Sequence, residues 1–350
     1  MVATFSKNDS HYMSLALKLA GQGRYGVKAN PMVGCVVVKD DQIIAKGYHQ
    51  TFGEAHAEIN ALEQINHQAD GSTLYVTLEP CSHVGKTPPC AQAIIDASVQ
   101  RVVIATLDPN PLVSSQGLAL LEAAGIQVDV GLLENEALTL NSGFIKRMQT
   151  GLPFVTCKIA MSLDGKTAMA SGESQWITGE AARTDVQHLR AKHQAIMTGS
   201  GTILSDNPSM TVRLDASTVS PLRVVIDSRQ KITDQTLNIF SKDAPTLILD
   251  PSNSKTLENG KLDLTDALKQ LGDQGINTVL LEAGPNLIGA MIEAHLIDEF
   301  IIYTAPILMG SHANSMATLV LGTMADKIQL QLSDIRMVGD DIRITANIKT

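Results

Sequence analysis

Apolar residues in the first 150 positions follow two spacings, one typical of helices and one typical of strands. Residues 10–21 repeat apolar side chains at helical spacing, with Asp9 or Ser10 as the expected cap. Short apolar runs between polar segments predict strands at 34–39, 42–49, 72–78, 101–106 and 126–130. Helices are predicted between them at 56–67, 89–97 and 115–124. This order indicates a sheet covered by helices, the α/β class.

A short polar break with glycine and proline, at 147–153, separates this half from a second one. A new strand is predicted at 154–161, with others at 195–199, 222–227, 245–249, 277–282 and 299–304 and a hairpin after Ile328. Helices are predicted at 180–192, 263–274 and 286–296. Because 350 residues exceed what one core usually serves, we expect two α/β domains, residues 1–148 and 152–350.

The composition of the chain argues against nucleic acids and membranes as binding partners. A net charge of −9 and 3% aromatic residues argue against nucleic-acid binding, which uses basic grooves and aromatic platforms. The first nine residues do not resemble a secretion signal, and no apolar run reaches the roughly 18 residues that cross a bilayer. We therefore expect a cytoplasmic protein with no membrane partner. Four cysteines at irregular spacing do not predict a disulfide framework, and metal binding is the better interpretation.

The candidate chemistry lies in His56-Ala57-Glu58, followed by Cys81 and Cys90. One imidazole and two thiols make three zinc ligands, and the open fourth position is typical of a catalytic zinc site. Glu58 would transfer the protons of the metal-bound water. The order matches the signature of zinc nucleobase deaminases, except that eight residues separate the two cysteines, where the usual pattern has two.

Two alternatives accompany this interpretation. The first is that these residues have no function, because a His-x-Glu pair alone, or two buried cysteines alone, usually have none; the ordered combination argues against it. Cys35 and Cys157 lie inside predicted strands and are interpreted as core residues. A purely structural zinc site in an inactive protein is the second alternative. Such a site has no need of Glu58, which argues against it.

The second half carries weaker signals. Residues 278–285 predict a strand and a glycine turn before a helix, and such a helix start can bind phosphate. The G-x-G-x-x-G fingerprint is absent, so from the residues alone a plain connection without a ligand is favoured. Trp176, the only tryptophan, is expected in the core.

With these motifs the chain resembles the bifunctional deaminase–reductase family of riboflavin biosynthesis over nearly its whole length. The carrying segments are 30–34, 53–58, 77–83, 85–90, 108–111, 158–166, 172–178, 199–202, 206–213, 225–228 and 282–285. The long separation of Cys81 and Cys90 is typical of that family. Residues 112–116 and 229–262 depart from its pattern.

The resemblance implies a cytidine-deaminase-like three-layer domain followed by a dihydrofolate-reductase-like domain. With zinc, the first would hydrolytically deaminate 2,5-diamino-6-ribosylamino-4(3H)-pyrimidinone 5′-phosphate. With NADPH, the second would reduce the ribosyl side chain of 5-amino-6-(5-phosphoribosylamino)uracil to ribityl. A homo-oligomer, most simply a dimer, is also expected. An RNA-editing-type zinc deaminase with an appended domain is the alternative.

Position by position, the resemblance implies that His56, Cys81 and Cys90 hold zinc and that Glu58 is catalytic. The expected contacts of the first substrate are Asn30, His49, His83 and Lys86. The expected contacts of the second substrate are Ser174, Arg190, Met210, Arg213 and Glu282. The expected contacts of NADPH are Lys158, Ala160, Trp176, Thr202, Asp206, Ser228, Gly284, Pro285, Asn286, Leu287, Ile288, Gly289 and Ala290.

Overall fold

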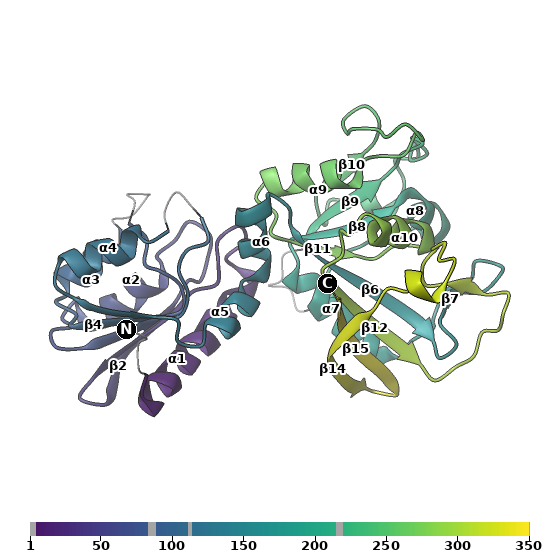
Figure 1. The fold of residues 1–350 in the computed structure, drawn as a ribbon. Coiled ribbons are helices and arrows are strands. Elements are labelled where there is room, and N and C mark those ends of the chain that lie inside the picture. Colours follow the sequence, from purple (N-terminus) through teal and green to yellow (C-terminus); the bar gives the residue numbers. More distant parts are fainter. Residues whose placement is uncertain (1–4, 83–88, 111–113, 215–219, 350) are drawn as a thin grey trace. The chain divides into compact units, whose positions relative to one another are not determined.

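The computed structural model describes residues 5–82, 89–110, 114–214 and 220–349. The chain divides into two compact units, Met1–Thr150 and Gly151–Thr350 (Figure 1). Among the described residues, no helix is long and apolar enough to cross a membrane.

The N-terminal unit contains a five-stranded sheet in the order β2-β1-β3-β4-β5. Its strands are β1 (Gly34–Lys39), β2 (Gln42–Tyr48), β3 (Thr73–Val76), β4 (Arg101–Ile104) and β5 (Gln127–Val130). Strand β1 is antiparallel to β2 and β3, whereas β3, β4 and β5 run parallel. Every strand predicted for this half of the chain is therefore present.

Helices cover both faces of this sheet and give the predicted three layers (Figure 1). One face carries α2 (Ala57–Leu62), α3 (Cys90–Asp96) and α4 (Gln116–Ala123); the other carries α1 (Lys7–Ala20) and α5 (Glu134–Leu140). The short turns η1 (Gly21–Tyr25) and η2 (Glu63–Ile65) and helix α6 (Ser142–Thr150) complete the unit. Along β1, Cys35 and Val37 face the first core while Val36 and Val38 face the second, since side chains alternate along a strand.

The first helix begins earlier than its apolar spacing predicted. Ser6 is the N-cap: its hydroxyl accepts a hydrogen bond from the Asp9 N–H at 3.0 Å, and the Asp9 carboxylate accepts one from the Ser6 N–H at 2.8 Å. This reciprocal pair is a capping box. The prediction of Asp9 or Ser10 as the cap is therefore wrong, because Asp9 is the helical partner of the true cap.

Two other predicted boundaries also shift. The helix predicted at 56–67 ends at Leu62 and continues only as a 3₁₀ turn, because Asn66 and His67 adopt left-handed backbone conformations with φ of 51° and 56°. The break predicted at 147–153 is shorter, since α6 runs through Thr150.

The C-terminal unit is built on an eight-stranded sheet in the order β10-β9-β8-β11-β6-β12-β15-β14. Its strands are β6 (Phe154–Ser162), β8 (Ala195–Gly199), β9 (Leu222–Ile226), β10 (Thr246–Leu249), β11 (Thr278–Leu281), β12 (Glu299–Ala305), β14 (Leu330–Val338) and β15 (Asp341–Ile348). The first six run parallel, and β15 and β14 form the predicted antiparallel hairpin at one edge. A small separate sheet pairs β7 (Lys166–Ala168) with β13 (Asn314–Ser315).

This sheet is also covered on both faces. Helices α9 (Leu264–Asp273) and α10 (Pro285–Glu293) pack on one face, and α7 (Glu180–Lys192) and α8 (Ser200–Asp206) on the other. Short 3₁₀ turns lie at η3 (Asn238–Phe240) and η4 (Met324–Asp326). The carboxyl ends of neighbouring parallel strands meet at one edge of a sheet, where α/β proteins bind ligands. Thr202, Ser228 and Gly284 follow β8, β9 and β11 and so share that edge.

Candidate active sites

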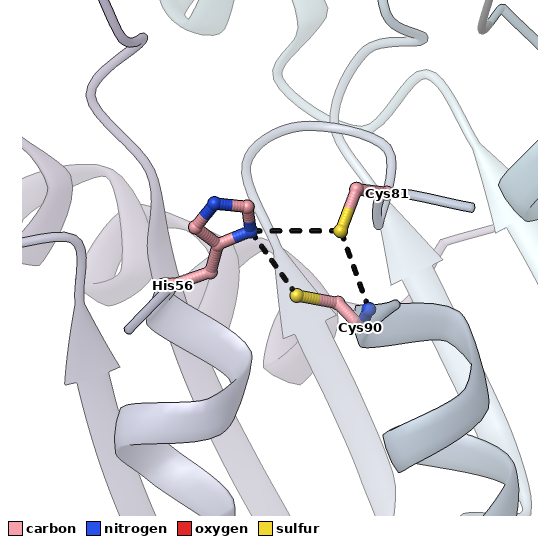
Figure 2. Close-up of side chains that lie close together, drawn as sticks. All are labelled: His56, Cys81 and Cys90. Atoms are coloured by element: carbon pink, nitrogen blue, oxygen red, sulfur yellow. Dashed lines mark hydrogen bonds between the residues drawn. The ribbon is translucent and has the colours of Figure 1, made fainter. Parts of the chain in front are cut away.

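The three expected zinc ligands come together in the N-terminal unit (Figure 2). His56 is the N-cap residue of α2, Cys90 is the first residue of α3, and Cys81 lies on the segment after β3. The His56 Nδ1 atom is 3.3 Å from the Cys90 Sγ and 3.6 Å from the Cys81 Sγ. Tetrahedral zinc with bonds of about 2.0–2.3 Å keeps its ligand atoms roughly 3.5–4 Å apart. One nitrogen and two sulfurs at these distances fit a zinc ion.

The two thiols differ in acidity. Cys81 Sγ accepts a hydrogen bond from the backbone N–H of Cys90 at 3.3 Å. Hydrogen bonding from the Cys90 thiol is the largest influence, and it lowers the pKa of Cys81 to about 4. The same hydrogen bond, together with burial, raises the pKa of Cys90. Cys81 is therefore the thiol that more readily becomes a thiolate, the form that binds a metal ion. A bound metal ion would favour deprotonation of Cys90 as well.

Glu58 lies in the first turn of α2 and is only 3% exposed. Its Oε2 atom is buried and has no hydrogen-bond partner among the described residues. Burial raises the pKa of Glu58 to about 7, although the nearby His56 opposes this. A carboxyl group that titrates near neutral pH can both take up and release a proton, as a general acid–base group must.

His49 lies beside this metal-ligand cluster and contacts Asn30. The rings of His49 and His56 meet edge to face, with centroids 5.4 Å apart. His49 Nε2 is 2.9 Å from the Asn30 amide nitrogen, and His49 Nδ1 is 3.0 Å from the Ala55 carbonyl oxygen. Burial lowers the pKa of His49. The expected contacts His83 and Lys86 lie outside the described residues.

Glu79 organises the segment that carries Cys81, and the sequence analysis did not single it out. Its carboxylate is 6% exposed. It accepts four backbone hydrogen bonds at 2.9–3.2 Å, from the N–H groups of Asp108, Ser115, Gly117 and Leu118. A Cβ on Gly117 would collide with the Pro80 carbonyl. The one sequence signal for this role is that Glu79 lies two residues before the expected ligand Cys81.

Asn141 is a second organising residue, and no sequence signal pointed to it. Its Oδ1 accepts a hydrogen bond from the Met32 N–H at 2.8 Å, and its Nδ2 donates to the Met32 carbonyl at 2.9 Å. These bonds join positions 109 residues apart. They anchor the loop that carries Asn30.

In the C-terminal unit, Glu282 joins two cations that were expected to contact ligands. Arg190 donates to both carboxylate oxygens, at 2.7 and 3.1 Å, and to the Thr211 carbonyl at 3.1 Å. Lys158 Nζ lies 3.6 Å from the Glu282 carboxylate. Burial would raise the pKa of Glu282, but Arg190 and Lys158 lower it to about 2. The cluster holds a net positive charge near the carboxyl edge of the sheet, where Glu282 follows β11.

In the turn expected to bind pyrophosphate, Gly284 has open space beside it, whereas Ile288 and Gly289 are packed against the protein. Gly284 is the N-cap of α10, and a Cβ there would meet only Thr202 Oγ1, at 3.9 Å, so this side of the turn is open. Ile288 is 2% exposed and belongs to the core. A Cβ on Gly289 would collide with the Thr318 carbonyl. Ile288 therefore packs in the core and Gly289 has a packing role, and the contacts of both residues with NADPH stay predictions.

Trp176 is 66% exposed, so the expectation of a core residue is wrong. The Arg183 guanidinium lies 4.9 Å from the centre of its ring, and a cation there supports one face of the indole. The aromatic surface is thus available as a stacking platform.

The remaining expected contacts differ in exposure. Asp206 and Arg213 are exposed, whereas Met210 is 3% exposed and packs in the core. The Ser228 hydroxyl accepts a hydrogen bond from the Leu262 N–H at 3.2 Å. The half-buried positions are Lys158, Ala160, Ser174, Thr202, Pro285, Leu287 and Ala290, and Asn286 is exposed.

Family models match both units. The cytidine and deoxycytidylate deaminase zinc-binding region matches residues 6–106. The RibD C-terminal domain matches residues 153–344. Fold and site thus define a zinc-dependent deaminase joined to a reductase domain.

Full-length relatives agree with this class. The Escherichia coli riboflavin biosynthesis protein RibD is 48% identical over 95% of this chain and 98% of its own length. The Bacillus amyloliquefaciens protein of the same name is 42% identical over 97% of this chain and 96% of its own. The chain belongs to the riboflavin biosynthesis protein RibD family, whose members are bifunctional deaminases and reductases.

Two solved structures share the whole architecture. Acinetobacter baumannii RibD, form 1, aligns with a TM-score of 0.92 at 43% identity, covering 98% of this chain and 99% of the other. A Thermotoga maritima diaminohydroxyphosphoribosylaminopyrimidine deaminase/5-amino-6-(5-phosphoribosylamino)uracil reductase aligns with a TM-score of 0.89 at 32% identity, with the same coverage. The predicted fold class and the predicted pair of activities are thereby confirmed.

Proposed function

We propose that this enzyme catalyses two consecutive steps on a phosphorylated pyrimidine. The N-terminal unit deaminates 2,5-diamino-6-ribosylamino-4(3H)-pyrimidinone 5′-phosphate, and the C-terminal unit reduces the ribosyl side chain of the product to ribityl. The observation that carries the first step is the His56–Cys81–Cys90 cluster beside the buried Glu58, whose Oε2 has no hydrogen-bond partner among the described residues. The likeness to the Thermotoga maritima deaminase/reductase, whose name specifies both pyrimidine phosphates, supports these substrates.

The roles of the deaminase residues follow from their chemistry. His56, Cys81 and Cys90 would hold zinc, which supplies a Lewis acid that makes water nucleophilic at neutral pH. Glu58 Oε2 would accept one proton from the attacking water and pass it to the ring nitrogen. It would then carry a second proton, from the hydroxyl group added to the ring carbon, to the amino group, which leaves as ammonia while the carbonyl forms. Its position in a buried first helical turn excludes competing solvent. Asn30 would orient the ring, and His83 and Lys86 would hold the phosphate side of the substrate.

In the reductase unit, NADPH supplies the hydride. The open turn at Gly284 and the start of α10 would face the cofactor's pyrophosphate through backbone N–H groups. The exposed Trp176 would stack on the cofactor, with Thr202 and Ser228 at the same sheet edge. Arg190 retains two of its five N–H donors beyond those used by Glu282 and Thr211, and with Arg213 it would bind the substrate phosphate.

The test measures both reactions on the same purified chain. Given the diaminopyrimidine phosphate and NADPH, the enzyme should release one ammonia and oxidise one NADPH per substrate consumed. Given pre-deaminated substrate, it should oxidise NADPH without releasing ammonia. Ammonia release from cytidine in RNA but not from the pyrimidine phosphate would support an editing deaminase instead.

We also propose that the enzyme forms a homodimer in the cytoplasm through the edge strand β14. The four apolar side chains Leu330, Leu332, Ile335 and Met337 are 37–62% exposed. A bulge between Leu332 and Asp334 keeps all four opposite the apolar β15 residues Ile348, Ala346, Ile344 and Ile342. This row continues the apolar face of the sheet to its outermost strand, and edge strands favour pairing with a second copy. Four free cysteines suit a reducing compartment.

Sedimentation tests the dimer. Ile335→Lys puts a charge into the apolar row and should convert a dimer into a monomer. Arg336→Lys, on the polar face of the same strand, should leave the sedimentation coefficient unchanged. A wild-type chain that sediments as a monomer at micromolar concentration would rule the proposal out.

A further inference from the structure

His49 lies between two hydrogen-bond partners, and together they fix its tautomer. Its ring is 2% exposed. Nδ1 faces the Ala55 carbonyl oxygen at 3.0 Å, and a carbonyl oxygen can only accept. Nδ1 therefore carries the proton, and Nε2 offers a lone pair to the Asn30 amide at 2.9 Å. The ring has no remaining polar atom for a substrate.

The tautomer in turn fixes the Asn30 amide. An unprotonated Nε2 requires the NH₂ group of Asn30 to face it, because the amide oxygen would repel the lone pair. Asn30 Oδ1 must then point away from His49. It accepts no hydrogen bond from the residues that the structure describes, and the side chain is half-buried.

The loop that carries Asn30 is held on its other side as well. Asn141 makes two hydrogen bonds to the Met32 backbone, and the Asn30 N–H donates to the Val27 carbonyl at 3.0 Å. The backbone around Asn30 is thus held by these bonds, and His49 fixes the orientation of the Asn30 side-chain amide. His49 also packs edge to face on His56, so the ring that orients the Asn30 amide contacts the metal-ligand cluster itself.

We propose that His49 is a positioning residue of the deaminase site, which aims the Asn30 carbonyl oxygen at a hydrogen-bond donor of the substrate, an amino or hydroxyl group. This inference rests on the proposed function. It differs from the expectation that His49 contacts the substrate itself. His49 acts on binding only through Asn30.

Two substitutions of His49 separate its two hydrogen bonds. The amide of Asn occupies the place of Nδ1, so His49→Asn keeps a donor for Ala55 and loses the acceptor for Asn30. The amide of Gln reaches the place of Nε2, so His49→Gln keeps an acceptor for Asn30. Asn30→Ala removes the amide itself. His67→Asn, at an exposed left-handed position that suits Asn, is the matched control.

Ammonia release is measured on the full chain, with zinc content, thermal unfolding and NADPH oxidation as controls for folding. Asn30→Ala should raise the deaminase KM about 10-fold, the effect of one lost hydrogen bond of about 1.4 kcal/mol, with kcat changed less than about twofold. His49→Asn should do the same, and the double variant His49→Asn/Asn30→Ala should be no worse than Asn30→Ala. His49→Gln should recover most of the KM.

Three results would overturn the inference: a double variant whose KM effects multiply to about 100-fold, a His49→Asn variant with a wild-type KM, or a His49→Gln variant as impaired as His49→Asn. A wild-type chain that releases no ammonia from the pyrimidine would instead reject the proposed function. The two failures are therefore distinguishable.

Discussion

Arg190 and Glu282 form a two-point ion pair inside the reductase unit, with Nε–Oε1 at 2.7 Å and Nη2–Oε2 at 3.1 Å. Both side chains are 13% exposed. Lys158 adds a second cation at 3.6 Å, and its side chain is 18% exposed. The ion pair connects α7, which carries Arg190, to the end of β11, which Glu282 follows. Lys158 connects the same carboxylate to β6. Stability of this unit therefore depends on a charged carboxylate.

The ion pair predicts the acid stability of the reductase unit. The folded pKa of Glu282 is about 2, below its ordinary value of 4.5, so the folded state binds the proton less readily than the unfolded state does. The contribution is fully present above about pH 4.5 and is lost as pH falls toward 2. Glu282→Gln leaves buried cations without their carboxylate, should cost about 3 kcal/mol, and should remove this part of the acid dependence. Urea unfolding between pH 2 and 7 measures both.

The control for that experiment is Asp273→Asn, which removes an exposed ion pair with Lys269. Exposed pairs contribute about 0–1 kcal/mol, so this variant should unfold like the wild type. Equal unfolding of Glu282→Gln and the wild type across the whole pH range would contradict the prediction.

Glu58→Gln should retain zinc, fold and NADPH oxidation while ammonia release falls by at least about 100-fold. The amide is nearly isosteric with the carboxyl group and is not a ligand, so only proton transfer is lost. Zinc analysis and coupled ammonia assays measure the outcome. Glu63→Gln, on the exposed turn after α2, is the matched control. Near-normal ammonia release by Glu58→Gln would remove this residue from the mechanism.

Cys81→Ser should abolish zinc binding and deamination, because a neutral hydroxyl replaces a thiolate ligand. Reduction of pre-deaminated substrate should persist, since the described residues of Gly151–Thr350 include none of the three ligands. Cys35→Ala, in the core of β1, should keep its zinc. Loss of both activities in a folded Cys81→Ser chain would argue for one composite site.

Gly284 and Gly289 should respond differently to the same substitution. Gly284→Ala places a Cβ in open space within the fold, so unfolding should be unchanged while the KM for NADPH rises if phosphate approaches this turn. Gly284→Val should raise it further, with zinc content and ammonia release unchanged. Gly289→Ala collides with the Thr318 carbonyl and should lower the unfolding temperature instead. Normal NADPH binding by Gly284→Val would move the cofactor site elsewhere.

Arg213→Ala should weaken the phosphorylated substrate of the reductase while NADPH binding stays the same. A charged hydrogen bond to phosphate contributes about 1.5–3 kcal/mol, and the exposure of Arg213 favours the lower value, about a 10-fold rise in KM. Substrate kinetics and NADPH fluorescence titration measure the two effects separately. An unchanged substrate KM would exclude Arg213 from the phosphate site.

Residue patterns along the chain were enough to predict the α/β class, most of the longer strands and helices, and the three candidate metal ligands that the fold brings together. Alternating side chains define the two faces of β1, and the types and order of His56, Glu58, Cys81 and Cys90 identify the chemistry. These features are local, because they depend on side-chain periodicity and on the donor atoms of single residues. The Ser6–Asp9 capping box is local in the same sense, because its two residues lie three positions apart.

Contacts between side chains from distant segments became visible only in the folded chain. Asn141 anchors Met32 from 109 residues away, Glu79 gathers N–H groups from a distant segment, and Arg183 supports a tryptophan that sequence reasoning assigned to the core. The tertiary structure also separated Gly284, with open space beside it, from Gly289, packed on the Thr318 backbone. Hydrogen bonds and close packing depend on distances between segments that are far apart in the chain, and residue spacing does not encode those distances.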